Sequence, residues 1–288
     1  MSPHYLTSEK ITEFINYSIA EDHGDGDHTS MGSIPESRLD TAQLLIKGDG
    51  VLAGVELARQ IFHHIDSEVE FNQILSDGDT VSPEDIAFTV SGSARALLGA
   101  ERLALNCMQR MSGIATYTRK MTDMLHGTNA KLLDTRKTTP NFRMAEKWAV
   151  SIGGGVNHRF GLYDMIMLKD NHIDFAGGVA KAIKSVNDYL EKSGKSLKIE
   201  IEVRNLRELE EVLEAGHVHR IMLDNMLPSD MKQAITMIDG QYETEASGGI
   251  TEDSIREIAE TGVDYISVGA LTHSYKSMDM SLKAVSKQ

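Results

Sequence analysis

Residues 134–172 read DTRKTTPNFRMAEKWAVSIGGGVNHRFGLYDMIMLKDNH and hold an unusual concentration of basic side chains. These are Arg136, Lys137, Arg143, Lys147, His158, Arg159, Lys169 and His172. Because the whole chain carries a formal net charge of -14, a local cationic cluster predicts a site for a small anion. The three consecutive glycines at 153–155 indicate that the backbone comes close to another group.

Composition bounds the class of protein. The chain has 288 residues, of which 41% are hydrophobic and 25% charged, which is typical of a soluble globular protein with one large or two modest domains. The single cysteine, Cys107, excludes an internal disulfide and favours a reducing compartment. No apolar run approaches the ~20 residues of a membrane span, and the N-terminus lacks a signal-peptide core. We expect a cytoplasmic protein that binds neither membrane nor nucleic acid.

The first 90 residues predict a small sheet packed by helices. Apolar residues recur at helical spacing between Leu6 and Ile19, so the chain opens with an amphipathic helix. The acidic loop EDHGDGDHTS at 21–30 resembles a calcium loop, but Ser30 stands where the glycine is required. A turn with capping carboxylates is the better interpretation. The extended pieces are AQLLIK (42–47), VLAG (51–54) and IAFTV (86–90), with a helix at 56–65.

A long helical pattern follows from Ala94 to Met124, and Ser112-Gly113 interrupts it. We therefore place the domain boundary after residue 112, with domains at 1–112 and 113–274. The C-terminal residues 275–288 are expected to pack back on the first domain.

After residue 128 short apolar strands alternate with helical segments, and each strand leads to a chemically active residue. The strands are AKLLD (130–134), DMIMLK (164–169), KIEIEV (198–203), HRIMLD (219–224), YETEAS (242–247) and VDYISV (263–268). Repeated βα units with functional groups at strand ends are typical of an α/β barrel, in which these ends converge on one face.

Each kind of strand end has a chemical interpretation. Arg136, Arg159 and Lys169 suit a substrate with more than one carboxylate. Glu202 and Asp224 suit magnesium or sugar hydroxyls. The turns Ser247-Gly248-Gly249 and Gly269-Ala270 suit a phosphate. Each residue alone also fits a structural role, such as a surface ion pair, and only their joint occurrence favours a site.

Several of these motifs together resemble the quinolinate phosphoribosyltransferase family, also called nicotinate-nucleotide pyrophosphorylase (carboxylating). They are ERLALN and QRMSGIAT within 101–116, DTRKTTP (134–140), GGGVNHR (153–159), LKDNHI (168–173), IEV (201–203), LDNM (223–226), SGGI (247–250) and SVGALTHS (267–274). The resemblance spans most of the chain, from the acidic loop to His273. DTRKTTP, GGG-x-NHR and LKDNH in this order are highly specific.

The resemblance implies an N-terminal α/β sandwich, a C-terminal open (β/α) barrel and a head-to-tail homodimer. It implies that phosphoribosyl pyrophosphate and quinolinate yield nicotinate mononucleotide, pyrophosphate and CO2 for NAD biosynthesis. By motif, Arg136, His158, Arg159 and Lys169 bind the quinolinate carboxylates, and Arg102 reaches the neighbouring subunit's site. Lys137 contacts the phosphoribosyl donor.

The remaining motif residues concern the sugar and its phosphate. The resemblance implies that Glu202 and Asp224 hold ribose hydroxyls and, through water, Mg2+. It implies that Ser247, Gly248, Gly249, Gly269 and His273 bind the phosphate end. Among the residues assigned to substrate, Lys137, Lys169, Glu202 and Asp224 are the expected catalytic set.

Two departures from the family pattern touch no residue assigned to substrate: Asn141 replaces a frequent glycine, and Ser151-Ile152 precede the triple glycine in place of Arg-Cys. Other functions stay open at this stage. A relative within the superfamily could use another pyridine or pyrrole acid. Lys169 could form a Schiff base, as in aldolases. A non-enzymatic phosphate-binding or nucleotide-binding module is the remaining alternative.

Overall fold

The computed structural model describes residues 5–285, and the chain divides into two compact units. Unit 1 comprises residues 1–119, 138–154 and 271–288, and unit 2 comprises residues 120–137 and 155–270. The segment 134–172 therefore crosses from one unit to the other and back. These units differ from the predicted domains at 1–112 and 113–274, because helix α5 (Arg143–Ile152) and residues 271–274 belong to unit 1.

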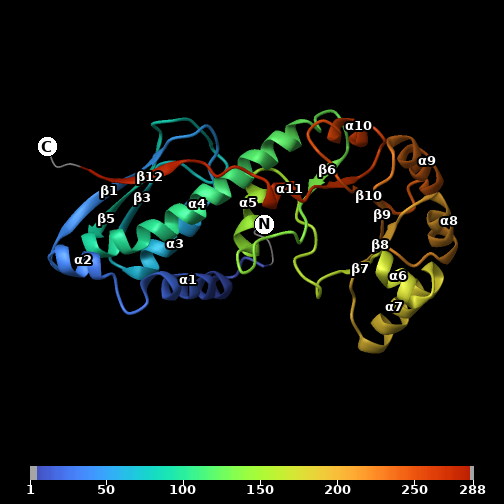
Figure 1. Cartoon of the computed structure of the whole chain (residues 1–288), viewed down its shortest axis with the longest axis horizontal. Helices are drawn as coiled ribbons and strands as arrows, with labels where there is room; N and C mark the ends of the chain where they lie inside the picture. Colours follow the sequence, from blue (N-terminus) through green and yellow to red (C-terminus); the bar gives the residue numbers. More distant parts are fainter. Residues whose placement is uncertain (1–4, 286–288) are drawn as a thin grey trace. The chain divides into compact units, whose positions relative to one another are not determined.

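Unit 1 is built on an antiparallel sheet in the order β12-β1-β5-β3, with a separate pair, β2-β4. Strand β12 comes from the C-terminal segment, and its residues 280–284 pair with residues 42–46 of β1 (Figure 1). The elements are α1 (Ser8–His23), α2 (His28–Ser33), β1 (Leu39–Ile46), β2 (Gly50–Val51), α3 (Val55–Ile65), β3 (Glu70–Gln73), β4 (Thr80–Val81), β5 (Ile86–Ser93), α4 (Ala94–Asp123), α5 (Arg143–Ile152), α11 (Ala270–His273) and β12 (Met280–Ala284).

The core of unit 1 forms where α3 packs on the sheet. The apolar face of α3 includes Leu57, Ile61 and Phe62, all nearly inaccessible to solvent. Phe71 of β3 and Phe88 of β5 have ring centroids 4.4 Å apart, and Phe62 lies 6.0 Å from Phe88. Burial of aromatic and aliphatic side chains from both layers stabilises this half of the fold.

Most sequence predictions for unit 1 are confirmed: the opening helix, the helix near 56–65, the long helix from residue 94 and two of the three extended pieces. The acidic loop also behaves as predicted, since Asp27 caps α2 by accepting a hydrogen bond from the Ser30 amide at 3.1 Å. The hydrogen bonds from Ser30 lower the pKa of Asp27. VLAG is not a full strand, because β2 ends at Val51.

Ser112-Gly113 does not interrupt the long helix, and that interpretation is wrong. Helix α4 runs through both residues to Asp123. The buried Ser112 hydroxyl accepts a hydrogen bond from the Ala53 amide at 2.8 Å. A Cβ on Gly113 would collide with the backbone of Lys276. These small residues let other segments approach the helix closely.

The triple glycine has a similar explanation. A Cβ on Gly153 would collide with the Ala115 carbonyl and with Thr118, both on α4. The Gly153 carbonyl also accepts a hydrogen bond from Nε of Arg119 at 3.1 Å. At Gly153 the close approach predicted from the sequence is therefore to a helix, which explains why residues 138–154 belong to unit 1.

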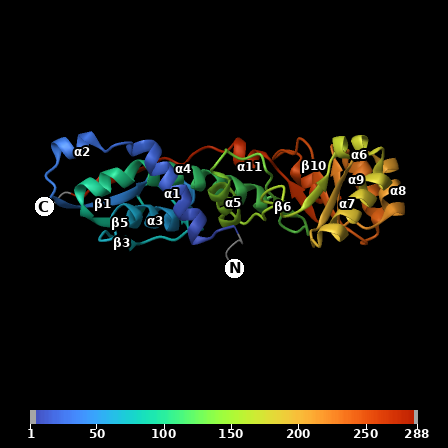
Figure 2. The same cartoon turned by 90° about the horizontal axis from the view of Figure 1, so that it is seen from below.

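Unit 2 is an open α/β barrel with six parallel strands in the order β6-β11-β10-β9-β8-β7. Helices α6 to α9 lie along one side of these strands (Figure 2). The elements are β6 (Lys131–Leu133), β7 (Ile166–Leu168), α6 (Asp170–Ala176), α7 (Val179–Ser193), β8 (Ile199–Val203), α8 (Leu206–Ala215), β9 (Arg220–Asp224), α9 (Pro228–Ile238), β10 (Glu243–Ser247), α10 (Ile255–Ala259) and β11 (Tyr265–Ser267).

All six strands predicted after residue 128 are confirmed, and so is the two-domain α/β fold class. Strand register places Glu200 beside Arg220 and Glu202 beside Met222. Since side chains alternate along a strand, Glu200, Glu202, Arg220 and Asp224 share one face of the sheet. Among residues 5–285, no helix combines the length and apolar character that crossing a membrane requires.

Candidate active site

Four predicted site residues lie where the parallel strands of unit 2 end: Lys169, Glu202, Asp224 and Ser247. Two contacts join them in pairs. Nζ of Lys169 lies 3.2 Å from Oε2 of Glu202, and the Ser247 hydroxyl donates to Oδ1 of Asp224 at 2.5 Å. The carboxyl edge of the sheet therefore collects these side chains, as the strand spacing predicts.

Glu202 and Asp224 act on each other electrostatically. Burial raises the pKa of the Glu202 carboxyl group, the Lys169 ammonium lowers it, and the charge of Asp224 raises it, with a net rise. Asp224 also accepts a hydrogen bond from the Asn225 side chain at 2.7 Å. Two carboxylates on adjacent strand ends form an oxygen-rich site suited to a hard cation or to hydroxyl groups.

Arg136 and Arg159 form a cationic pair. Burial lowers the pKa of the Arg159 guanidinium, and the positive charge of Arg136 lowers it further. Nη1 of Arg159 donates to the Met165 carbonyl at 3.1 Å, which orients the half-buried side chain. Two like charges held close together favour an anion between them, because the anion relieves their repulsion.

Asp134 joins the two motifs that carry these arginines, and the sequence predictions did not include it. The side chain is fully buried at the end of β6. Oδ1 accepts a hydrogen bond from the His158 amide at 2.8 Å, and Oδ2 accepts one from the Asn157 side chain at 2.7 Å. DTRK and NHR are thus held side by side through one carboxylate.

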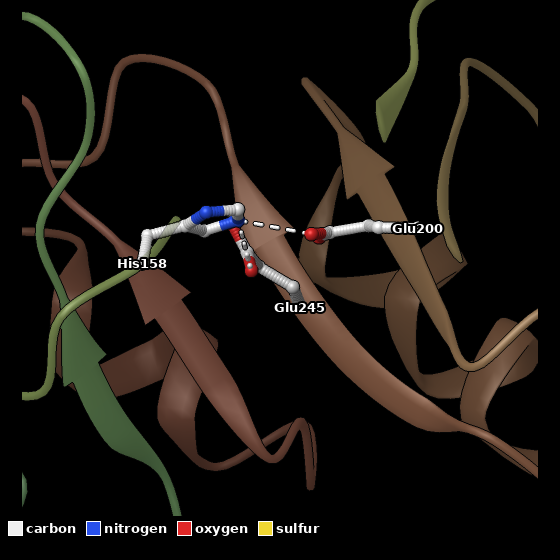
Figure 3. A group of neighbouring side chains, drawn as sticks. All are labelled: His158, Glu200 and Glu245. Atoms are coloured by element: carbon white, nitrogen blue, oxygen red, sulfur yellow. Dashed lines mark ion pairs between the residues drawn. The ribbon is translucent and has the colours of Figure 1, made fainter. Parts of the chain in front are cut away.

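His158 points into the sheet rather than away from the protein. Figure 3 shows its ring directed toward Glu200 and Glu245. Nε2 lies 2.9 Å from Oε2 of Glu200 and 3.4 Å from Oε2 of Glu245, and both glutamates are fully buried. Nδ1 accepts a hydrogen bond from the Arg159 amide at 2.7 Å. Both ring nitrogens therefore contact groups of the protein itself.

The pKa shifts in the cluster around His158 indicate that it holds an extra proton. Burial lowers the pKa of the imidazole but the two carboxylates raise it, and the net direction is upward. Because Nδ1 offers its lone pair to the Arg159 amide, we place the extra proton on the carboxylates. Burial, together with the charge of Glu245, raises the pKa of Glu200 to about 7. Burial opposes ionisation of Glu245, but the hydrogen bond from His158 gives its pKa a net lowering.

Glu200 should therefore make stability depend on pH. Its carboxyl group keeps a proton to about pH 7 in the folded chain, against an ordinary pKa of 4.5. Its stabilising contribution is full below pH 4.5 and is lost as pH rises through 7, by about 3 kcal/mol in total. The free energy of unfolding of Glu200→Gln should not fall in this way between pH 4.5 and pH 8. Urea unfolding of the parent and of the variant at both pH values measures this difference, and equal pH dependence in the two proteins would contradict the assignment.

The glycine turns lie at the same edge of the sheet. Gly248 has φ +100°, and a Cβ there would collide with the side chain of Asn225. Gly249 also has a positive φ, of 60°. Only glycine fits the Gly248 position without strain, and the turn brings Gly248 against Asn225, the residue that follows Asp224.

Of the remaining predicted residues, Lys137 follows β6 and Gly269 follows β11 in unit 2, whereas Arg102 and His273 are exposed residues of unit 1. Arg143 and Lys147 lie on α5 in unit 1, whereas Arg136, Arg159 and Lys169 belong to unit 2. His172 contributes to a helix cap, since its Nδ1 accepts a hydrogen bond from the Lys169 amide at 3.1 Å.

Paired arginines, paired carboxylates and a glycine turn at one edge of a parallel α/β unit define a class: barrel proteins that bind substrates bearing carboxylate and phosphate groups. Residues 27–112 match the N-terminal domain of quinolinate phosphoribosyl transferase, and residues 114–283 match its C-terminal domain. The chain belongs to the quinolinate phosphoribosyltransferase family.

Curated relatives and solved structures agree with this membership. Quinolinate phosphoribosyltransferase [decarboxylating] 1b of Nicotiana tabacum is 46% identical, over 93% of this chain and 81% of the relative. A Bacillus subtilis protein named as a probable nicotinate-nucleotide pyrophosphorylase [carboxylating] is 41% identical, over 95% of this chain and 93% of the relative. The crystal structure of NadC from Streptococcus pyogenes has a TM-score of 0.90 at 40% identity, covering 98% of this chain and 99% of that one.

Proposed function

We propose that the chain transfers the phosphoribosyl group of phosphoribosyl pyrophosphate to quinolinate with decarboxylation, giving nicotinate mononucleotide, pyrophosphate and CO2 for NAD biosynthesis. Its relatives are named for this reaction. The observation that carries the proposal is the Arg136–Arg159 pair in the same unit as the Glu202–Asp224 pair. The first pair suits a dicarboxylate, and the second suits a ribose that develops positive charge.

The dicarboxylate end of the site, called the substrate clamp below, consists of Arg136, Arg159 and Lys169. Guanidinium groups bind carboxylates through two parallel hydrogen bonds, and the ammonium adds a third positive charge. Nζ of Lys169 lies 3.2 Å from Oε2 of Glu202, and this ion pair orients the side chain for a binding role. We leave His158 out of the clamp because its ring nitrogens contact the protein.

Glu202 and Asp224 serve the sugar. When the bond between the anomeric carbon and pyrophosphate breaks, the ribose acquires oxocarbenium character, which nearby carboxylates stabilise. Their oxygen donors also fit Mg2+, and Glu202 and Asp224 would hold it through water. Magnesium, when bound, neutralises charge on the departing pyrophosphate. Lys137 contacts the phosphoribosyl donor, and Ser247, Gly248, Gly249, Gly269 and His273 bind its phosphate end.

The reaction needs no nucleophile from the protein. The quinolinate nitrogen bonds to the anomeric carbon while pyrophosphate leaves with the electron pair of the broken bond. The pyridinium ring then accepts the electron pair of the bond to the neighbouring carboxylate. CO2 departs, and a proton from solvent replaces it. Charge and positioning are therefore the protein's main contributions.

A direct assay tests the function. Purified protein should convert quinolinate and phosphoribosyl pyrophosphate to nicotinate mononucleotide when Mg2+ is present, and chelation should abolish turnover. Nicotinate, which has one carboxylate fewer, should react at least 100-fold more slowly, since a lost charged hydrogen-bond pair costs about 3 kcal/mol. Absence of product at saturating substrate would refute the function. Comparable turnover of nicotinate would refute the dicarboxylate assignment.

We also propose a homodimer in which Arg102 completes the partner's site, and a cytoplasmic location consistent with one buried cysteine. Some plant relatives are named as mitochondrial or chloroplastic.

A mixing experiment tests the shared site. Arg102→Ala and Lys169→Ala should each be nearly inactive alone. After dissociation and reassociation together they should recover up to about a quarter of parental activity, because half of the dimers are mixed and each contains one intact site. No recovery, with subunit exchange verified by mass spectrometry, would exclude sharing.

A further inference from the structure

The interior of unit 2 holds a charged network that the proposed reaction does not use. Nη1 of Arg220 lies 3.1 Å from Oε2 of Glu245, and its guanidinium stacks 4.1 Å from the Tyr265 ring centroid. Glu200 and Glu245 are fully buried. The charge of Arg220 balances one of these two carboxylates. The second carboxylate needs a proton or a further cation, since an uncompensated buried charge is costly.

The imidazole of His158 connects this network to the substrate clamp. One ring nitrogen contacts the two carboxylates, and the other accepts the amide hydrogen of Arg159 at 2.7 Å. The His158 amide in turn donates to the buried Asp134. The backbone at 158–159 is therefore fixed from two directions, and the Arg159 side chain departs from this fixed point.

We propose that Glu200 and Glu245 are positioning residues that act through His158, which aims Arg159 at a substrate carboxylate and does not itself bind the substrate. This inference rests on the proposed function, since it assigns Arg159 to quinolinate. It replaces the role in carboxylate binding that the sequence resemblance implied for His158.

The same three side chains could also be considered as metal ligands, since their donor atoms lie within 4.8 Å of one another. Charge decides against this. With Arg220 already paired to Glu245, a divalent cation would leave the buried cluster with excess positive charge, whereas one proton balances it.

Kinetics of Glu245→Gln test the proposal. We expect the KM for quinolinate to rise about tenfold, or about 1.4 kcal/mol, because the carboxylate of Glu245 that lies 3.4 Å from Nε2 of His158 loses its charge. The KM for phosphoribosyl pyrophosphate should stay unchanged. Glu243→Gln is the matched control, because Glu243 contacts the same Arg220 at 3.1 Å, while its described partners are Arg220, Lys198 and Tyr265. It should behave like the parent.

A double-mutant cycle separates positioning from general damage. In an Arg159→Ala background, Glu245→Gln should raise the KM for quinolinate less than twofold, because the residue through which it acts is gone. The same tenfold increase in both backgrounds would overturn the proposal. If the parent itself shows no turnover, the proposed function fails instead.

A spectroscopic measurement tests the contact independently of activity. Nitrogen-15 NMR of the parent should show an unprotonated Nδ1 and a protonated Nε2 for His158, with the signals identified by their loss in His158→Gln. Glu245→Gln should shift both. A protonated Nδ1 in the parent would overturn the proposal, and so would stoichiometric zinc in the parent that is lost in Glu245→Gln.

Discussion

Arg159→Lys is expected to lower kcat/KM for quinolinate by roughly 100-fold and to leave the KM for phosphoribosyl pyrophosphate unchanged. Lysine keeps the charge but loses the planar fork that binds a carboxylate through two hydrogen bonds. Two charge-assisted bonds replaced by one weaker contact cost about 3 kcal/mol. Lysine also gives up the contact with the Met165 carbonyl that orients the side chain.

Arg159→Ala should cost more, roughly 1000-fold, because the charge is lost as well. Arg207→Ala is the control, since Arg207 is 87% exposed on α8 in the same unit. Steady-state kinetics with each substrate varied in turn measure the effects. A loss shared equally between the two substrates would show that Arg159 supports the fold of the site. Parental kcat/KM in Arg159→Lys would show that it does not bind a carboxylate bidentately.

Local patterns in the sequence predict the architecture of unit 2 almost completely. Apolar strands such as HRIMLD and glycine stops such as Gly216 after α8 are local signals, and the strand ends bring Lys169, Glu202 and Asp224 to one edge. The parallel order follows from the intervening helices, since a crossover is the usual way to connect parallel strands.

The division into units could not be predicted in this way. Helix α5 follows β6 in the chain, so the local pattern assigns it to the barrel. It belongs to unit 1 because Gly153 lets the chain approach Ala115 closely. That contact is between segments distant in sequence, and a local pattern cannot report it. The local pattern also makes Ser112-Gly113 look like a helix interruption, because it cannot report their contacts with the distant residues Ala53 and Lys276.

Glu200, Glu245 and Arg220 are harder to predict from the sequence than the residues of the substrate clamp. KIEIEV contains glutamates two residues apart, and YETEAS does too. In a strand this spacing puts both carboxylates on one face, and buried carboxylates require partners. Glu200 and Glu245 could have been found by this argument, and Arg220 in HRIMLD is the complementary charge. The sequence does not show which histidine meets them, because His158 lies on a loop.

Asp134→Ala should have the second large effect, on both stability and activity. Removal of the buried carboxylate leaves the His158 amide and the Asn157 side chain without these acceptors. We expect about 3 kcal/mol of lost unfolding free energy and at least a 100-fold lower kcat/KM, since DTRK and NHR are no longer held together. Urea unfolding and kinetics on the same preparations measure both, and a loss below 1 kcal/mol would contradict this role.

An exchange of side chains distinguishes the hydrogen-bond pattern from simple loss of packing. In Asp134→Asn alone, the new side-chain amide faces the amide of Asn157. This variant should retain only part of the parent's free energy of unfolding. Asp134→Asn combined with Asn157→Asp restores a donor facing an acceptor, and the Oδ1 of residue 134 can still accept from the His158 amide. The double variant should recover at least half of the stability lost in Asp134→Asn. Its kcat/KM should recover less, because the negative charge has moved from the end of β6 to the loop that carries Arg159. If the double variant is no more stable than Asp134→Asn, the charge of Asp134 rather than its hydrogen bonds holds the two motifs together.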